Sequence, residues 1–302
     1  MSLKEMLPEY MTEFPEMGRA DLRDLKKGID QSFRTFTREN GEAIENFFYP
    51  LKMFMVWFEK LLLGTPWPLM IAVLCLLVWL GARSIIMVVG TALALMLIGY
   101  LGMWDDTMRT LALVSVSTFV CIAIGIPVGI LMSKSDRIQA VIVPILDIMQ
   151  TIPAFVYLIP VLMLLGIGKV PGLIAVCIYA IPPVVRLTNL GIRLVDKDVL
   201  EAADAFGASP RQKMLKVQLP LALPNLFAGV NQTIMMALAM VVVASLIGAH
   251  GLGSQVLKAV NNQYLTLGMM NGLAIVAIAI VFDRVSQKFG KRLQKHSEKI
   301  HG

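Results

Sequence analysis

Charged side chains are scarce in this 302-residue chain, at 16% of the total, against about 25% in average globular domains. Apolar residues reach 57% and the mean hydropathy is +0.71. This composition excludes an ordinary water-soluble domain and predicts an all-α, polytopic membrane protein. The net charge of +6 is spread over the N-terminal segment, short loops and the C-terminal tail. A positive-inside bias explains much of that excess, so we expect no nucleic-acid partner.

Cysteine and histidine are also rare, with three of each. The cysteines are far from one another in sequence and lack metal spacing, and the histidines form no ligand cluster with them. Each cysteine falls inside a predicted apolar span, where a thiol packs as a small hydrophobe. The residues concerned are Cys75, Cys121, Cys177, His250, His296 and His301. We therefore expect no metal site.

Motifs for nucleotide hydrolysis and nucleophilic catalysis are missing. The chain has no Gly-x-x-x-x-Gly-Lys-Ser/Thr phosphate loop and no Gly-x-Ser-x-Gly elbow. The run from Gly166 to Lys169 is too short for a phosphate loop and lies in a predicted external turn. We expect no catalytic residues and no cofactor in this chain, so any energy that its function needs has to come from a partner.

Seven apolar stretches approach the length of about 20 residues that a transmembrane helix needs. Only Ala82 and Arg83 separate the first two. The predicted spans are 66–81, 84–103, 110–132, 141–165, 171–190, 224–247 and 266–282. They define a transmembrane domain over 66–285, preceded by an N-terminal tail, 1–65, and followed by a basic cytoplasmic tail, 286–302.

The first 40 residues are polar and of mixed charge, and they lack the basic-then-apolar order of a cleavable signal peptide. From 41 to 64, apolar residues recur at three- and four-residue steps, while charged residues interrupt any continuous span. This pattern predicts an amphipathic helix that either lies in the membrane interface or packs on the transmembrane bundle. Both placements stay open at this point.

The most informative stretch runs from Glu201 to Pro220, a polar segment between long apolar runs. Glu201 is expected in the first turn of one helix, which Gly207 ends. Ser209 before Pro210 offers the cap of a second short helix that continues to Pro220. The sequence therefore predicts a helix, a sharp turn and a helix that project out of the membrane.

This stretch follows a spaced pattern: Glu-Ala-Ala, three residues, Gly, nine residues, an aliphatic residue, one residue and Leu-Pro. The pattern resembles the cytoplasmic coupling loop of the membrane subunits of ABC importers, which would cover residues 196–222 of this chain. Val217 stands where isoleucine is usual. The resemblance implies that this segment docks on a separate ATPase subunit, which would bind ATP and magnesium. The implied contact residues are Glu201, Ala202, Ala203, Asp204, Phe206, Gly207, Ala208, Ser209 and Arg211. An ordinary amphipathic loop helix is the alternative.

Placing the coupling loop in the cytoplasm fixes the orientation of every span. Basic residues of other loops and of the tail then fall on the same side, while Asp105 and Asp106 fall on the opposite side, as the positive-inside rule requires. Arg109, Lys169 and Lys258 are the basic exceptions outside. This orientation puts the first 65 residues outside the cytoplasm of a multi-pass protein of the bacterial inner membrane.

Further segments between about 100 and 285 resemble the permeases of the glycine betaine/L-proline class of ABC importers. They are Leu146–Pro160, Ile181–Pro183, Arg186–Thr188, Phe206–Gln212, Gly229–Thr233 and Gly248–Ser254, with His250 where a smaller residue is expected. The resemblance implies a type I (MetI-like) transmembrane fold and an ammonium osmolyte as solute: glycine betaine, choline, proline betaine or trimethylamine N-oxide. It also implies a homodimer of permeases on two ATPase subunits, with an extracytoplasmic solute-binding protein.

Two other functions stay open. An ABC permease for amino acids such as methionine would share the coupling loop. An ATP-independent channel or secondary transporter would have no use for the segment from Glu201 to Pro220.

Polar residues inside apolar spans are costly in lipid unless they face protein or water. Asp147 and Arg186 lie at similar depth on neighbouring antiparallel spans, so we predict an ion pair that braces the bundle or binds solute directly. Candidate residues of the solute pathway are Gln150, Thr151, Phe155, Tyr157, Asn231, Gln232 and Thr233. The amides and hydroxyls among them could equally join helices, and the aromatics could pack rather than offer π faces to an ammonium group.

Overall fold

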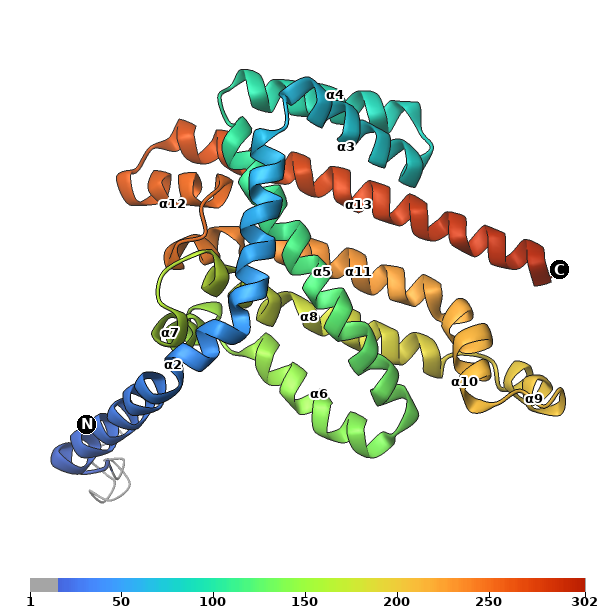
Figure 1. Ribbon diagram of the computed structural model, residues 1–302, viewed down its shortest axis with the longest axis horizontal. Helices are drawn as coiled ribbons and strands as arrows, with labels where there is room; N and C mark the ends of the chain where they lie inside the picture. Colours follow the sequence, from blue (N-terminus) through green and yellow to red (C-terminus); the bar gives the residue numbers. More distant parts are fainter. Residues whose placement is uncertain (1–15, 302) are drawn as a thin grey trace, which may run out of the picture. The chain divides into compact units, whose positions relative to one another are not determined.

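The computed structural model describes residues 16–301, in which every regular element is helical (Figure 1). The chain divides into two compact units, residues 1–47 and 48–302. The helix α2 (Arg19–Gly64) runs through the division and contributes to both units.

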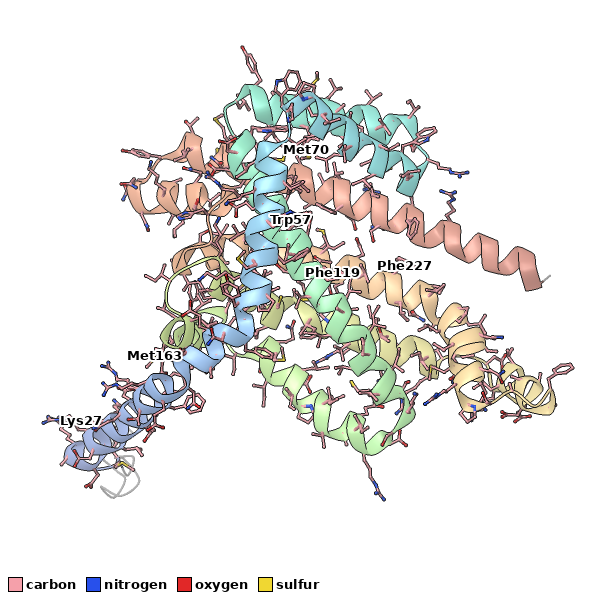
Figure 2. The ribbon with its side chains drawn as sticks, in the orientation of Figure 1. Lys27, Trp57, Met70, Phe119, Met163 and Phe227 are labelled. Carbon is pink, nitrogen blue, oxygen red and sulfur yellow. The ribbon has the colours of Figure 1, made fainter. Side chains whose placement is uncertain are left out.

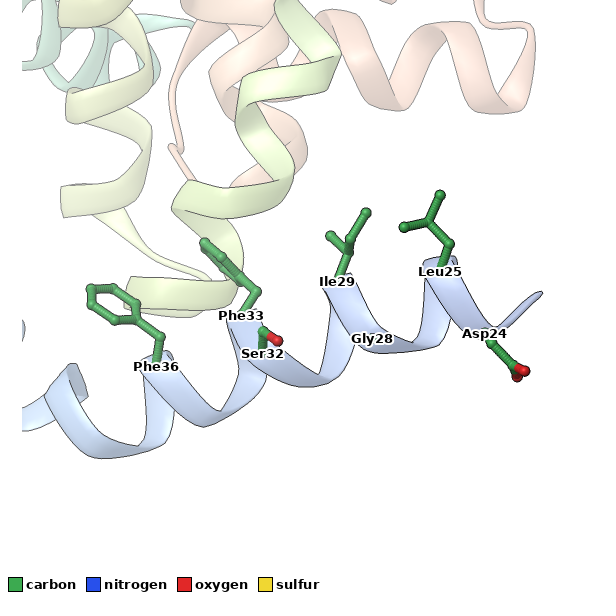
Figure 3. A pocket seen from close by; sticks show the side chains of 7 residues that line it. All are labelled: Asp24, Leu25, Gly28, Ile29, Ser32, Phe33 and Phe36. Carbon is green, nitrogen blue, oxygen red and sulfur yellow. The ribbon is translucent and has the colours of Figure 1, made fainter. Parts of the chain in front are cut away.

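In the first unit, α2 carries an apolar stripe along one face (Figure 3). Leu25, Ile29, Phe33 and Phe36 follow one another at three- and four-residue steps, which places them on one side of the helix, while Asp24 points away from them. Helical amphipathicity therefore begins well before residue 41, where the sequence pattern predicts its start. Residues 1–15 of the predicted polar tail lie outside the described residues.

The second unit holds the remaining described helices. They are α3 (Trp67–Ala82), α4 (Ile85–Tyr100), α5 (Trp104–Lys134), α6 (Asp136–Thr151), α7 (Ala154–Leu165), α8 (Lys169–Arg193), α9 (Lys197–Ala205), α10 (Pro210–Lys213), the π-helical η2 (Met214–Gln218), α11 (Leu219–Ala244), the 3₁₀ turn η3 (Ser245–Ile247), α12 (Leu252–Asn262) and α13 (Leu265–His301). Of the predicted domain boundaries, residue 65 directly follows α2 and residue 285 lies inside α13.

Four helices of the described chain are long and apolar enough to cross a membrane, or six if each of two bent pairs forms one span, whereas the sequence predicts seven spans. One reason is α4, which has only 16 residues. Another is the predicted span 141–165, which breaks at Ile152 and Pro153 into α6 and α7, bent by 100°. Proline removes a backbone donor and pushes the preceding residue into an extended conformation, and Ile152 has a ψ of 128°.

The second bend, of 112°, separates α2 from α3. Within the second unit, Met55, Glu59 and Leu62 of α2 are each at most 8% exposed. The ring of Phe54 lies 6.3 Å from that of Phe119 on α5, centroid to centroid, and Figure 2 labels Phe119 on α5. Of the two placements that the sequence leaves open, packing on the bundle is therefore the observed one for this part of the helix.

The centre of the second unit is formed by α5, α8 and α11, and small residues let these helices approach closely. A Cβ atom added at Gly129 of α5 would lie 2.6 Å from the Cβ of Thr188 and 2.7 Å from the carbonyl oxygen of Val185, both on α8. On α11, a Cβ atom added at Gly229 would lie 3.0 Å from the Cα of Val184 on α8. Glycine at these two positions therefore sets the spacing of the three central helices.

The two ends of this bundle carry different elements (Figure 1). One end holds α9, α10, the turns between α3 and α4 and between α5 and α6, and the end of α13. Arg83 lies in the first of these turns, while Lys134 ends α5 and Arg137 lies in the first turn of α6, on either side of the second. The opposite end holds α12 and the starts of α5 and α8, with Asp105 and Asp106. The segment predicted to face the ATPase thus shares one end of the bundle with the basic turns.

Candidate coupling loop and solute pathway

The predicted coupling loop begins with the short helix α9. Asp196 caps this helix, because its Oδ1 accepts a hydrogen bond from the backbone N–H of Asp198 at 3.0 Å. The cap places the first helical residue at Lys197. Glu201 therefore lies in the second turn of α9 and not in the first turn, where the sequence pattern predicts it.

A sharp turn follows α9 at the predicted glycine. Gly207 has a φ of +74°, a left-handed conformation that glycine adopts without steric strain. The backbone N–H of Ala208 returns to the carbonyl oxygen of Ala203 at 3.0 Å, and that of Phe206 to Ala202 at 3.1 Å. These bonds use carbonyl groups that the end of the helix would otherwise leave without partners.

The second half of the turn is capped as predicted. The N–H of Gln212 donates to Ser209 Oγ at 3.3 Å, and the N–H of Ser209 donates to Gln212 Oε1 at 2.8 Å, which together form a capping box with Pro210 in the first turn. Lys213 Nζ lies 2.6 and 2.7 Å from the carboxylate oxygens of Asp204, so an ion pair ties the two sides together. We call residues 196–213 the elbow.

The sequence pattern predicts that the second helix ends at Pro220, but the helix continues beyond this residue. It passes from α10 through η2 into α11, where Pro220 is the second residue. Proline has no N–H to donate, and the N–H of the preceding Leu219 bonds to the carbonyl oxygen of Met214, five residues back, as in a π-helix. Pro210 to Ile247 is one helical run of 38 residues. The predicted coupling segment and a central helix of the bundle are therefore joined by continuous helical backbone.

The tip of the elbow is open to a partner, while its base is anchored. Phe206 is 92% exposed, and the predicted contact residues are exposed except for Ala203 and Ala208, which are half-buried. Met214, just beyond the elbow, packs in a buried cluster with Ile192 of α8 and residues of α11. The elbow is thus an exposed surface held by a rigid base.

The predicted ion pair is present beside the break between α6 and α7. Arg186 Nη2 of α8 hydrogen-bonds to Asp147 Oδ1 of α6, and the two side chains are 43% and 55% exposed. Gln150 Nε2 donates to the carbonyl oxygen of Tyr179 on α8 at 2.9 Å. Thr151 is exposed at the end of α6. We call Asp147, Gln150, Thr151 and Arg186 the bend surface.

The other pathway candidates divide between exposed and packed positions. Phe155, which is 60% exposed, and Gln232 face outward from the described chain. Thr233 is fully buried, and Tyr157 donates its hydroxyl to Met240 Sδ at 3.8 Å. Asn231 points to α13. The structure therefore does not bring the seven candidates into one site; Gln150, Thr151 and Phe155 lie together around the α6–α7 break.

Asp283 on α13 is a polar contact that sequence reasoning missed, because it falls one residue beyond the predicted span. Its Oδ1 accepts hydrogen bonds from Asn231 Nδ2 of α11 and from Gln287 Nε2, both at 2.8 Å. A carboxylate that joins two helices in this way is expected to hold them together. Asn231, a predicted pathway residue, thus forms a hydrogen bond to α13.

Glu59 on α2 is a second contact that sequence reasoning missed. It lies 2.8 Å from Lys169 Nζ at the start of α8 and 3.9 Å from Arg109 Nε of α5, and its side chain is 8% exposed. Two of the three basic exceptions to the positive-inside pattern thus meet one buried acid. Its position on the same helical face as Met55 and Leu62 was the available signal.

Removing the charge of Glu59 is expected to loosen α2 from the bundle. The change Glu59→Gln keeps the side-chain size but leaves Lys169 without its partner, and we expect a loss of about 1–3 kcal/mol in stability. Thermal unfolding of the purified protein measures this effect. The matched control is Glu42→Gln, at an exposed position of the same helix. Equal melting temperatures for the two variants would contradict a stabilising role for Glu59.

The pairing of Asp147 with Arg186 is tested by a double-mutant cycle on melting temperature and on the KM of transport. Because both side chains are about half exposed, we expect a coupling free energy of about 1 kcal/mol or less. If the pair braces α6 against α8, Asp147→Asn with Arg186→Gln costs less stability than the sum of the single changes, and KM stays unchanged. A shift in KM without coupled stability would assign the pair to solute binding.

A comparison with known families identifies the chain. Residues 122–295 match the model of the binding-protein-dependent transport system inner membrane component family. The chain belongs to this family. It is therefore a multi-pass permease subunit of an ABC transporter in the inner membrane, in agreement with the resemblance seen in the sequence.

Named relatives and solved structures agree with this assignment. The permease is 48% identical over 242 residues to a glycine betaine/proline betaine transport system permease protein of Escherichia coli (strain K12), covering 80% of this chain and 68% of the relative. It is 50% identical over 206 residues to a glycine betaine/carnitine transport permease protein of Listeria monocytogenes, covering 68% and 73%.

A chain of the MetNI methionine ABC transporter in an inward facing conformation aligns with a TM-score of 0.57 at 22% identity, over 63% of the permease and 95% of that chain. At this identity the likeness shows the fold alone. The predicted type I, MetI-like fold is thereby confirmed.

Proposed function

We propose that this permease moves glycine betaine or a related quaternary or tertiary ammonium osmolyte across the inner membrane. Transport is driven by ATP hydrolysis in a separate ATPase subunit that docks on the elbow. The observation that carries the coupling is the helical run from Pro210 to Ile247, which joins the exposed elbow to a central helix without a break. The solute class is supported by the relatives, which are named for glycine betaine, proline betaine and carnitine. All three compounds carry a quaternary ammonium group and a carboxylate.

The proposed assembly contains two permeases, two ATPase subunits and a solute-binding protein. Each chain offers one elbow, so two chains are needed to engage two ATPase subunits. ATP and magnesium would bind in the ATPase, and closure of the two ATPase subunits would push both elbows and switch the pathway from outward to inward facing. Solute selectivity is assigned mainly to the binding protein.

Gln150 and Thr151 of the bend surface, together with Phe155, are the proposed part of the solute pathway. Gln150 and Thr151 are uncharged and exposed, so they can exchange hydrogen bonds with a passing zwitterion without holding it. Phe155, also exposed, offers a π face to an ammonium group. Thr233, which is buried, and Asn231, which bonds to Asp283, are better suited to joining helices.

Uptake by proteoliposomes that contain the permease, its ATPase and its solute-binding protein tests this function. Glycine betaine, choline, trimethylamine N-oxide and methionine are compared with ATP and with a non-hydrolysable analogue inside the vesicles. We expect uptake of the ammonium compounds when the vesicles contain ATP, and no uptake when they contain the non-hydrolysable analogue. Preferential uptake of methionine would favour an amino-acid permease, and uptake without ATP would favour a channel or secondary transporter.

A further inference from the structure

A cavity of about 510 Å³ lies between α2, α3, α4, α5 and α13, away from the elbow and the bend surface. Met70, labelled in Figure 2, forms part of its wall on α3. All of the lining side chains are apolar except Thr65, Thr91 and Ser115. Thr65 donates its hydroxyl to the carbonyl oxygen of Leu61 at 2.7 Å, and Thr91 donates to that of Met87 at 2.8 Å. The cavity is therefore suited to a hydrocarbon rather than to the polar solute.

The cavity opens toward the surroundings of the bundle along α3. Leu69, Val73 and Leu77 line it and yet are between 42% and 57% exposed. The opposite wall of the cavity belongs to α13, and only 17% of the apolar stretch of this helix is buried inside the protein. In an inner-membrane protein, exposed apolar side chains on such helices face lipid, so the cavity is accessible from the bilayer.

The length of the cavity matches one leaflet. On α3 it extends from Leu69 to Val78, which is about 13 Å at 1.5 Å per residue. Half of a hydrocarbon core of roughly 30 Å is about 15 Å. A single extended acyl chain of one leaflet would therefore run along the cavity from end to end.

Two arginines lie beyond the end of the cavity that faces the elbow's side of the bundle. Arg83 is the residue that follows α3, and Arg292 Nη1 donates to the carbonyl oxygen of Leu80 in the last turn of α3 at 3.2 Å. Arg292 also lies two helical turns beyond Val285, which lines the cavity, and so continues the same face of α13. Among the described residues, neither arginine has a carboxylate partner. Their charge suits a phosphate group.

We propose that this cavity binds one acyl chain of an anionic phospholipid from the leaflet on the elbow's side, with the phosphate held by Arg83 and Arg292. The bound lipid fills the gap between the peripheral helices α3 and α4 and the span α13. It acts as a structural ligand at a site separate from solute translocation. The proposal does not depend on which solute the permease carries.

Photolabelling of the permease in nanodiscs tests the site. The probe is phosphatidylglycerol with a diazirine near the end of one acyl chain, and labelled peptides are identified by mass spectrometry. We expect labels on α3, α4 and α13 that unlabelled phosphatidylglycerol displaces. Ala277→Phe, which fills the cavity, should lower this labelling roughly tenfold. The matched control Val276→Phe, at a neighbouring exposed position outside the lining, should not.

A second comparison isolates the headgroup. Arg83→Gln with Arg292→Gln should lower labelling by the phosphatidylglycerol probe roughly tenfold and bring it to the level of a matched phosphatidylcholine probe. Labelling spread evenly over all lipid-facing helices, or unchanged by Ala277→Phe, would overturn the proposal. Loss of permease dimers in the Ala277→Phe variant, without any cavity label in the wild type, would assign the cavity to a second copy of the chain instead.

Discussion

Replacing Gly207 with arginine is expected to abolish ATP-driven transport while the membrane bundle stays folded. A Cβ at this position meets no atom within 4 Å, so the fold has room for the side chain. The φ of +74° costs a non-glycine residue about 1–2 kcal/mol locally. The new charged side chain would stand beside Phe206 at the tip of the elbow, where it blocks a fitted docking surface. Uptake should fall to background, with a melting temperature close to the wild-type value.

Gly102 provides the matched control for this prediction. It has a φ of +75° with open space around its Cβ position, and it lies between α4 and α5 at the opposite end of the bundle. Gly102→Arg carries the same backbone strain and the same added charge, and it should retain transport. Normal ATP-driven uptake by the Gly207→Arg variant would refute the role assigned to the elbow.

Replacing Gly129 with leucine is expected to prevent the central helices from packing. Even a Cβ would lie 2.6 Å from Thr188 Cβ and 2.7 Å from a carbonyl oxygen of α8, and a backbone atom cannot rotate away. Overpacking typically costs about 1–3 kcal/mol, and a full leucine between two helices should exceed this range. We expect aggregated protein on size-exclusion chromatography, with Gly129→Ala intermediate in melting temperature.

The control for this variant is Gly90→Leu. Gly90 also lies inside a helix, but nothing is found within 4 Å of its Cβ position. It therefore reports the effect of a larger helical side chain without a packing conflict. Equal melting temperatures for Gly129→Leu and Gly90→Leu would show that α5 and α8 are not held as closely as described.

Local signals in the sequence were sufficient to predict the elbow. Gly207, Ser209 and Pro210 act through their own backbone and side-chain chemistry, so the break and the cap are found where the pattern places them. The predicted end of the second helix at Pro220 is wrong, because the helix continues past this proline, where the local hydrogen-bond pattern changes to that of a π-helix. The π-helical stretch joins α10 to α11, and no residue pattern near it signals that continuation.

Features that depend on the packing of distant segments were not accessible in the same way. The bend at Pro153 is not one of these features, because a proline inside a helical pattern is a local signal for a kink; a count of apolar residues alone treats 141–165 as one span. Glu59 interrupts an apolar face and therefore suggests an exposed position, yet Lys169 and Arg109 come to it from 50 or more residues away. The pair of Asp147 and Arg186 was predictable because both charges lie at similar depth on adjacent spans. The hydrogen bond between Asn231 and Asp283 was not predictable in this way.

Photocrosslinking from the tip of the elbow is the most direct test of the coupling proposed here. A benzophenone-bearing amino acid replaces Phe206, which is 92% exposed, and the assembled transporter is irradiated with and without ATP. The proposed function predicts a crosslink to the ATPase subunit whose yield changes when ATP binds. A crosslink to the solute-binding protein, or none to the ATPase in a complex that still transports, would contradict it.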